Sequence, residues 1–282
     1  MTRDKWTDTW EGGQVSDCIS CIVADNASPY TFNGSSSWII DSRDGESCIV
    51  IDPGPDASHH IEILASACAR QHGRVLAILG THNHGDHLGG AEHFAQLVKA
   101  PALSVANGSL KAGPIDIPGF GRTVECIPTP GHSEDSVAFL MSEESALFIG
   151  DTCFENCSSL INYPDGNLSE YVDSTTKLVD IIESQNIQHV LPGHKGPMTN
   201  AAQQLRKVVA GRLKRVSQIV ESCQAGAPFD CDVLVNKLYG DIRPGLSYAV
   251  RVTTLSSMKY VIEHDLLPGL ADPKALDVPL IV

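Results

Sequence analysis

The chain has 282 residues, of which 42% are hydrophobic and 19% charged, so it can bury a sizeable core and needs neither disulfides nor a partner chain to fold. Its formal net charge of −14 is unevenly spread: residues 1–200 carry 10 basic and 26 acidic side chains, whereas residues 201–264 carry 9 and 5. The acidic body disfavours nucleic acid as a general partner, although the segment 201–264 is locally basic.

The chain contains nine cysteines, an odd number. Residues 1–6 lack the basic-then-apolar run of a signal peptide, and no stretch approaches the roughly 18 apolar residues of a membrane span. We therefore expect a cytoplasmic protein without a membrane partner. Its cysteines are expected to be free thiols, most of them packed in the core.

The first elements expected along the chain are a β-hairpin, a helix and a buried strand. Residues 37–40 and 48–51 are apolar runs separated by an Asp-Gly turn signal, which predicts the hairpin. Residues 58–71 have helical spacing, and residues 75–79 form the short continuous apolar run typical of a buried strand. This strand leads directly into a histidine-rich run, after which residues 88–98 again have helical spacing.

After residue 100 the predicted elements are mainly short strands, and after residue 200 they are helices only. Strands are predicted at residues 102–105, 123–127, 136–140, 146–149 and 188–191, with one helix among them at 168–184. Only helices follow, at residues 201–223, 230–239 and 246–264, with turns at 225–228 and 243–245. We therefore expect a catalytic domain over residues 1–200, a small helical unit over 201–264 and a tail over 265–282.

The densest group of chemically active residues follows the predicted strand 75–79. His82, His84 and His87 form with Asp86 the pattern H-x-H-x-D-H. Side chains so closely spaced in a loop can converge on one point, and imidazole and carboxylate are standard zinc ligands. A solvated polar loop does not account for this density of ligand types between an apolar strand and a glycine pair.

Three further residues occupy equivalent positions. His132, Asp151 and His194 each follow the end of a predicted strand. A single histidine after a turn is more often a surface residue. Four strand ends that each offer a ligand type predict one shared metal site, because strand ends are where strand-and-helix folds place their sites.

Together these residues resemble the metallo-β-lactamase superfamily. Its five motifs occur in order as Asp52 in Ile51-Asp52-Pro53-Gly54, the histidine run, His132, Asp151 and His194. The resemblance covers about residues 28–200. It implies an α/β fold, an αββα sandwich with two metal ions at one edge between the two sheets.

The resemblance also implies a role for each motif residue. The first ion would be bound by His82, His84 and His132. The second ion would be bound by Asp86, His87 and His194, with Asp151 bridging the two. Asp52 would orient a ligand histidine from behind, and Asp86 would also orient the attacking hydroxide.

The ligand types indicate which metal is bound and what it does. Five imidazoles and two carboxylates suit two Zn²⁺ ions, with iron and manganese as alternatives. An acidic residue in place of His84 would have favoured the redox di-iron branch. Two ions about 3.5–4 Å apart can share a water and lower its pKa, so a metal-bridged hydroxide would replace a side-chain nucleophile.

A narrower resemblance concerns residues 25–38, which are similar to the entry segment of the β-lactamase-like-protein-2 branch. Ala27 stands where that branch has its first proline, and three serines replace Thr-Asn-Thr. Members of the branch often end in a small winged-helix-like unit. Residues 201–264 resemble this unit in position and length, although no pair of strands for a wing follows Leu255.

Three functions follow as hypotheses. The first is a dinuclear zinc hydrolase that acts on a small-molecule ester, thioester or lactone. The second is a single-stranded RNA endonuclease whose predicted helix contacts phosphates through Arg206, Lys207, Arg212, Lys214 and Arg215, unless these form a solvated face. The third is a non-enzymatic metal-binding regulatory protein, which is disfavoured because all seven ligand positions hold competent residues.

Overall fold

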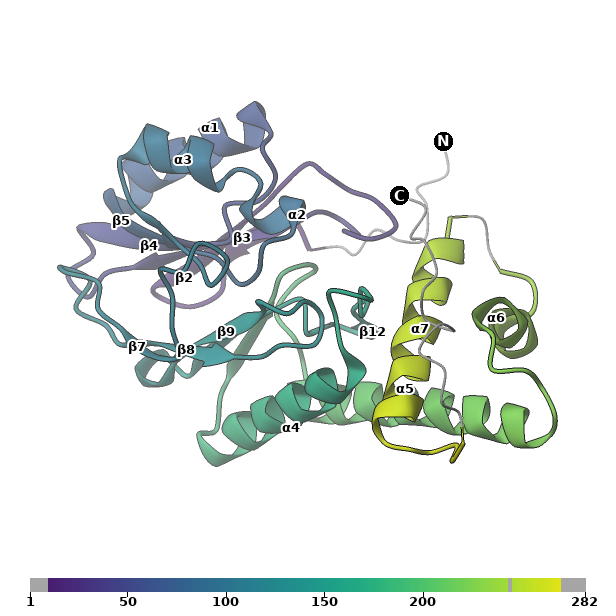
Figure 1. The fold of residues 1–282 in the computed structure, drawn as a ribbon. Coiled ribbons are helices and arrows are strands. Elements are labelled where there is room, and N and C mark those ends of the chain that lie inside the picture. Colours follow the sequence, from purple (N-terminus) through teal and green to yellow (C-terminus); the bar gives the residue numbers. More distant parts are fainter. Residues whose placement is uncertain (1–9, 243–244, 270–282) are drawn as a thin grey trace.

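The computed structural model describes residues 10–242 and 245–269. Two β-sheets lie face to face, and helices cover the outer face of each sheet (Figure 1). This layering is the predicted αββα sandwich. No helix among these residues is both long and apolar enough to cross a membrane. All nine cysteines are free thiols, as expected.

The first sheet has six strands in the order β1-β2-β3-β4-β5-β6. They are β1 (Gly12–Gln14), β2 (Ile19–Val23), β3 (Ser36–Asp41), β4 (Ser47–Ile51), β5 (Arg74–Leu79) and β6 (Ala102–Leu103). The predicted hairpin is the antiparallel pair β3 and β4, in which Trp38 lies opposite Ile51. β4, β5 and β6 run parallel, so helices must connect them.

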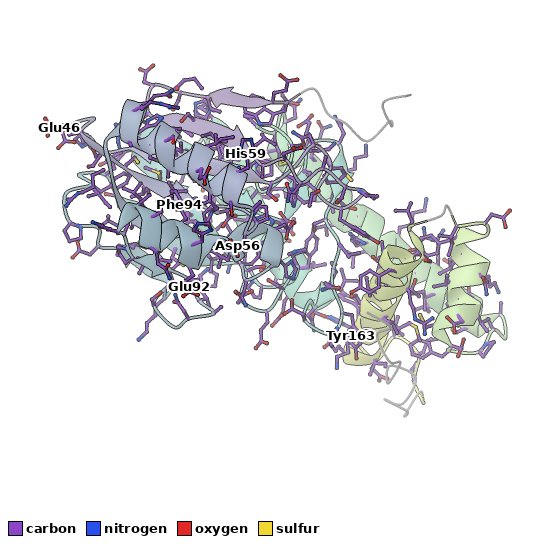
Figure 2. All side chains as sticks on the ribbon, turned by 90° about the horizontal axis from the view of Figure 1, so that it is seen from above. Glu46, Asp56, His59, Glu92, Phe94 and Tyr163 are labelled. Carbon is purple, nitrogen blue, oxygen red and sulfur yellow. The ribbon has the colours of Figure 1, made fainter. Side chains whose placement is uncertain are left out.

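These connecting helices cover the outer face of the first sheet. They are α1 (Ser58–Ala67), which continues as a π-helical turn over Cys68–His72, then α2 (Gly85–Leu88) and α3 (Ala91–Val98). Phe94 of α3 lies between α1 and α3 in Figure 2 and is fully buried. The predicted helix 88–98 is wrong in its first turn. The helix is interrupted at Gly90, which has φ −85° and ψ 1°, so α2 and α3 are separate helices. A side chain at Gly90 would lie 2.6 Å from that of Ile61, which explains why glycine stands there.

The second sheet has five strands in the order β13-β10-β9-β8-β7. They are β7 (Gly113–Ile115), β8 (Val124–Pro128), β9 (Val137–Met141), β10 (Ala146–Gly150) and β13 (His189–Pro192). All neighbours are antiparallel except β10 and β13, which are connected through α4 (Leu168–Ser184). A separate short hairpin is formed by β11 (Cys153–Phe154) and β12 (Cys157–Ser158).

Strand alternation explains why the predicted strands are continuous apolar runs. In β3, Trp38 and Ile40 point into the core between the sheets, whereas Ile39 points into the core under α1 and α3. Both faces of the strand are therefore buried, and each fully buried aliphatic side chain contributes roughly 1.5–3 kcal/mol to stability.

The C-terminal helices are α5 (Ala201–Gln224), α6 (Cys231–Tyr239) and α7 (Ser247–Glu263). α5 begins against α4 and the second sheet, where Leu205 is fully buried, and ends in a separate core with α6 and α7, where Ile219 is fully buried. It is therefore shared by both parts, and the division of the chain at residues 200 and 201 stays a prediction. Residues 201–242 and 245–269 contain helices and no wing strands.

Two predictions at this end of the chain fall mostly outside the described residues. They concern the tail, of which residues 270–282 are not described, and the turn at 243–245, of which residues 243 and 244 are not.

Candidate metal centre

Four strand ends meet at one edge between the two sheets. The chain leaves β5, β8, β10 and β13 there, and each departure carries predicted ligand residues. A backbone hydrogen bond of 2.8 Å from Val137 N–H to the Thr81 carbonyl joins the histidine run to the second sheet. The structure brings together all seven side chains for which we predicted metal binding, His82, His84, Asp86, His87, His132, Asp151 and His194.

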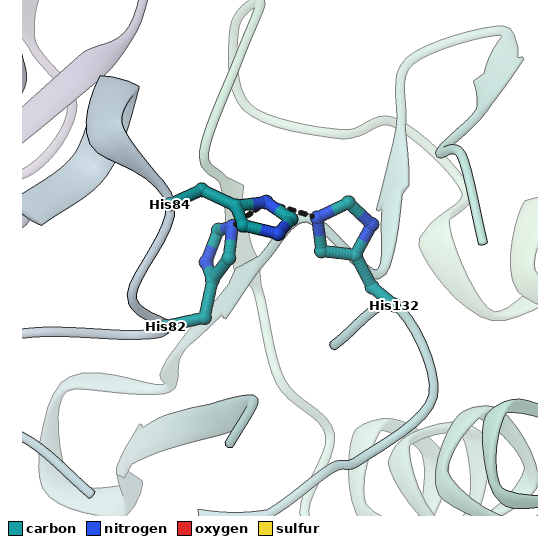
Figure 3. Close-up of side chains that lie close together, drawn as sticks. All are labelled: His82, His84 and His132. Carbon is teal, nitrogen blue, oxygen red and sulfur yellow. Dashed lines mark hydrogen bonds between the residues drawn. The ribbon is translucent and has the colours of Figure 1, made fainter. Parts of the chain in front are cut away.

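Three of these histidines form a compact triangle (Figure 3). His84 Nδ1 lies 3.1 Å from His82 Nε2 and 3.0 Å from His132 Nε2. His82 and His132 are buried, whereas the side chain of His84 is 29% exposed. The triangle therefore closes one end of the site, with His84 at its rim.

The outer nitrogen of each ring has a hydrogen-bond partner. His82 Nδ1 lies 3.0 Å from Thr81 Oγ1, His84 Nε2 lies 3.3 Å from Asp165 Oδ2, and His132 Nδ1 donates to the Leu160 carbonyl at 2.5 Å. The inner nitrogens then present lone pairs to one another. Lone pairs at this separation repel unless a cation lies among them, and a zinc–nitrogen bond of about 2.0–2.1 Å suits such a triangle.

The remaining ligand candidates form a second group beside the triangle. Asp86 Oδ2 lies 3.2 Å from His194 Nε2 and 3.7 Å from His87 Nε2. Asp151 directs Oδ1 toward His87 Nε2 at 3.3 Å, and Oδ2 toward His194 Nε2 at 3.4 Å and His132 Nε2 at 3.9 Å. Asp151 thus contacts both groups, the position that a bridging ligand requires.

Two atoms of this second group are buried without a hydrogen-bond partner among the described residues. They are His87 Nε2 and Asp151 Oδ1, which lie 3.3 Å apart as an ion pair but do not form a well-directed hydrogen bond. Both atoms are of types that bind metal ions, and a cation between them would satisfy both. Gly193 also keeps this place clear, because a side chain there would lie 2.4 Å from Asp151 Oδ1. The cluster therefore fits a pair of metal ions.

The charge states of the cluster suit cations. Burial raises the pKa of Asp151, but the charges of His194 and His87 outweigh it and hold the pKa well below its usual range. Burial, with the charge of His87, lowers the pKa of His82 well below its usual value. Burial likewise raises the pKa of Asp86, but the hydrogen bond from His194 and the charges of His87 and His194 together outweigh it, and the pKa falls to about 2. Ionised carboxylates and neutral imidazoles are the metal-binding forms.

Two histidines must release protons when metal binds. Burial lowers the pKa of His87, but the negative charges of Asp151 and Asp52 raise it well above the usual value. Burial lowers the pKa of His194 in the same way, and Asp151 and Asp86 raise it to about 9. Without metal these two rings carry protons at neutral pH, so cations and protons compete for them.

Asp52 makes the contact that its predicted role requires. Its Oδ2 accepts a hydrogen bond from His87 Nδ1 at 3.0 Å and another from Thr81 Oγ1 at 2.7 Å, and its Oδ1 accepts one from Thr81 N–H at 2.8 Å. Asp52 is 1% exposed and has the left-handed φ of 52°. The contact with Asp52 orients the His87 ring so that Nε2 faces the other candidate ligands. Thr81, which Asp52 also contacts, in turn contacts His82 Nδ1.

Asp165 is a site residue that the sequence analysis missed. Its Oδ2 lies 3.3 Å from His84 Nε2, and its Oδ1 accepts a hydrogen bond of 3.2 Å from Glu134 N–H. Asp165 lies in a loop between β12 and α4, 81 positions from His84. It follows no predicted strand, so a search of strand ends could not find it.

We expect Asp165→Asn to weaken zinc binding by about 10-fold, because ligand histidines rely on such partners for their orientation and basicity. Competition with a chromophoric chelator measures the affinity. Asp173→Asn, an exposed aspartate of α4, is the matched control and should bind zinc as the wild type does. Equal affinities for all three proteins would contradict this role of Asp165.

The group of seven candidate ligand side chains lies at the bottom of a cavity of about 650 Å³. Apolar side chains from three places line it: the loop before β3, the hairpin β11–β12 and the beginning of α7, represented by Phe32, Phe154 and Val250. Tyr30 Oη donates to the Gly245 carbonyl at 3.1 Å and so connects the first of these places to the third. The C-terminal helices therefore form one wall of the cleft above the cluster.

Comparisons with known proteins agree with this arrangement. The family model of the metallo-beta-lactamase superfamily matches residues 30–114. A beta-lactamase-like protein 2 homolog of Caenorhabditis elegans is 26% identical over 92% of this chain and 88% of its own length. An atrochrysone carboxyl ACP thioesterase of Aspergillus fumigatus is 29% identical over 72% of this chain and 64% of its own length.

Solved structures show the same fold. A metallo-beta-lactamase family protein of Thermus thermophilus superposes with a TM-score of 0.69 and 17% identity, over 88% of this chain and 94% of its own. A beta-lactamase domain protein of Burkholderia ambifaria superposes with a TM-score of 0.71 and 17% identity, over 90% of this chain and 88% of its own.

Proposed function

We propose that this chain, whose residues 30–114 match the metallo-β-lactamase superfamily, is a hydrolase of that superfamily and a dinuclear zinc enzyme that cleaves thioesters. The observation that carries this proposal is the convergence of five imidazoles and two carboxylates at one edge of the sandwich. A single group of three ligands would serve one ion, whereas here Asp151 contacts both groups.

The two ions would be held by the two groups described above. His82, His84 and His132 would hold the first, and Asp86, His87 and His194 the second, with Asp151 between them. When bound, the zinc pair supplies the Lewis acidity that makes water a nucleophile at neutral pH. Zinc is preferred over iron or manganese because imidazole dominates the ligand set.

Asp86 is the residue that we assign to handling the water. Its side chain is 31% exposed, whereas that of Asp151 is 10% exposed, so Asp86 reaches the cleft. It lies on α2 with Oδ2 directed toward His194, and an ionised carboxylate there would orient a water by accepting a hydrogen bond from it. The oxygen of this water forms a bond to the thioester carbonyl carbon, the carbon–sulfur bond breaks, and the proton that the water loses ends on the leaving sulfur, so that an acid and a thiol are released.

Two observations favour a thioester over an ester or a lactone. The cleft beside the cluster is lined mainly by apolar side chains, which suits an acyl group. The relative from Aspergillus fumigatus is named as a thioesterase. A thiol also leaves readily, because its pKa of about 8.5 lets it depart as a thiolate without a strong general acid.

RNA cleavage and a non-enzymatic regulatory role are less well supported than thioester hydrolysis. Of the basic residues for which we predicted RNA contacts, Arg206 is paired with Glu183 at 2.5 and 2.7 Å and lies outside the cleft. The ligand set is complete, which a protein that only binds a partner would not need.

Metal analysis together with a substrate panel tests the proposal. We expect protein purified without chelators to contain about two zinc equivalents and to hydrolyse a benzoyl thioester faster than the matching oxygen ester. Prolonged dialysis against a chelator should abolish the activity, and added zinc should restore it. A metal content near zero, or cleavage of single-stranded RNA without thioester hydrolysis, would overturn the proposal.

A further inference from the structure

The cleft above the metal cluster continues into a second cavity, of about 350 Å³, along α5. The two cavities share part of their lining, namely Cys157, Ser158, Arg212, Tyr239 and Thr253. We propose that this second cavity binds a phosphate group on the thiol arm of the substrate, so that the enzyme acts on acyl thioesters of a phosphorylated thiol. This inference rests on the proposed function and specifies the substrate class of the same site.

The first support is the charge of the cavity. Lys207, Arg212 and Arg215 line it, and no acidic residue does. This is notable in a chain whose formal net charge is −14. A cavity with three cations and no carboxylate raises the local concentration of an anion, and guanidinium groups match the oxygens of a phosphate.

Arg215 is held in place for such a ligand. Its Nη1 donates to the Leu238 carbonyl at 3.3 Å, and its guanidinium lies over the ring of Tyr239, 4.2 Å from the ring centre. Tyr239 ends α6, so the contact fixes the side chain between two helices. A guanidinium that is already ordered loses little conformational entropy when an anion binds.

Arg212 lies where the two cavities meet. Its Nη2 donates to Ser158 Oγ at 3.3 Å and to the Ser159 carbonyl, and both serines face the metal-side cleft. Its Nε is buried and has no hydrogen-bond partner among the described residues. The contacts of Nη2 fix the Arg212 side chain at this place, so its positive charge stays beside both cavities.

Gly211 lines the second cavity without a side chain to fill it. It lies in the interior of α5, lines the second cavity, and a side chain there would meet no atom within 4 Å. Glycine weakens a helix interior compared with alanine, so local helix stability does not explain its presence. Without a side chain at this position, a ligand can approach the helix backbone between Lys207 and Arg215.

The arrangement favours a single phosphate-bearing arm over an RNA strand. An RNA strand carries one phosphate per nucleotide and needs an extended basic track. Here the cations lie in one compact cavity, whereas residues 1–200 carry 26 acidic and 10 basic side chains. The apolar cleft between this cavity and the metal cluster suits an acyl chain and its thiol arm.

Matched substrates that differ by one phosphate test the proposal. Benzoyl-pantetheine and benzoyl-4′-phosphopantetheine share the acyl group, the thioester and the arm. We expect the wild type to have a kcat/KM about 10-fold or more higher for the phosphorylated compound, as charge-assisted hydrogen bonds imply. Arg215→Gln and Gly211→Leu should each lower this ratio toward one. Arg206→Gln removes a cation from the same helix outside the cavity, and it should keep the ratio.

Binding of the products gives a readout that does not depend on turnover. In isothermal titration of the zinc-loaded protein, 4′-phosphopantetheine should bind about 10-fold more tightly than pantetheine, and Arg215→Gln should remove the difference. Such an arm can belong to a free coenzyme or to a carrier protein. Comparing the rates of hydrolysis of benzoyl-coenzyme A and of a benzoylated carrier protein distinguishes these two sources.

The outcomes separate this inference from the proposed function. Equal binding of the two thiols, or an equal ratio in Arg215→Gln and in the wild type, would overturn the phosphate site even if thioesters are hydrolysed. Hydrolysis of neither thioester would overturn the proposed function, while tighter binding of the phosphorylated thiol would still support the phosphate site. Preferential cleavage of a single-stranded RNA oligonucleotide, abolished in Arg215→Gln, would replace the thiol arm with a nucleic acid.

Discussion

Replacement of Asp86 by alanine is expected to lower kcat/KM for a thioester at least about 10²-fold, while the protein stays folded. Asp86 is the more exposed of the two carboxylates that line the cleft, and its Oδ2 lies 3.2 Å from His194 Nε2. Under the proposed function, alanine would remove both a ligand to the second ion and the group that orients the water. Steady-state kinetics of the zinc-loaded protein measure the loss.

The fold should tolerate this substitution because Asp86 lies on a four-residue helix outside the hydrophobic cores. Thermal unfolding of the metal-free protein should therefore remain cooperative, with only a modest drop in midpoint, because His194 loses the contact with Asp86 but keeps the one with Asp151. Glu92→Ala, which removes an exposed carboxylate from the following helix, is the matched control and should retain full activity. Wild-type turnover in Asp86→Ala would refute the assigned role, and a large drop in the unfolding midpoint would make it a structural residue.

Asp52→Ala is expected to destabilise the metal-free protein by about 3–5 kcal/mol, the cost of removing one partner from a buried ion pair. The substitution leaves the backbone N–H of Thr81 and the Nδ1–H of His87 without their acceptor. It also places alanine at a φ of 52°, a conformation that aspartate and asparagine tolerate better. Urea unfolding measures this change.

The same substitution should weaken zinc binding by about 10- to 100-fold, because His87 loses the contact that orients it. Asp52→Asn is the informative comparison. It keeps an acceptor for Thr81 N–H and tolerates the left-handed backbone, but it lacks the negative charge that faces His87. We expect intermediate losses for it. Stability within about 1 kcal/mol of the wild type and unchanged zinc affinity in Asp52→Ala would contradict the proposed linkage.

The strands that were predicted well share a physical property. β4 and β5 are buried on both faces, so their sequences are continuous apolar runs that can be recognised locally. β1, β2, β7, β11 and β12 were not anticipated. β2 has five residues and the other four have two or three each, and the pairing of all five depends on a neighbouring strand rather than on their own pattern.

The candidate site divides in the same way. The convergence of the candidate ligand residues could be predicted because imidazole and carboxylate are unusual at the ends of apolar strands, and because four such ends share one edge of a sandwich. Asp165 could not be predicted, because its contact with His84 arises only when the loop before α4 folds over the histidine run. The split between α2 and α3 at Gly90 likewise depends on the approach of α1.

The sequence by itself determined the types of the ligands, their order along the chain and most of the elements that carry them. These are local properties, since periodicity and strand ends are set by neighbouring residues. Only the tertiary structure decided that α5 is shared between two cores and that its cations line a cavity beside the metal cleft. Both depend on how α4, α6 and α7 pack against α5. The apolar pattern of α5 predicts a helix with one buried face, but it does not say which elements cover that face.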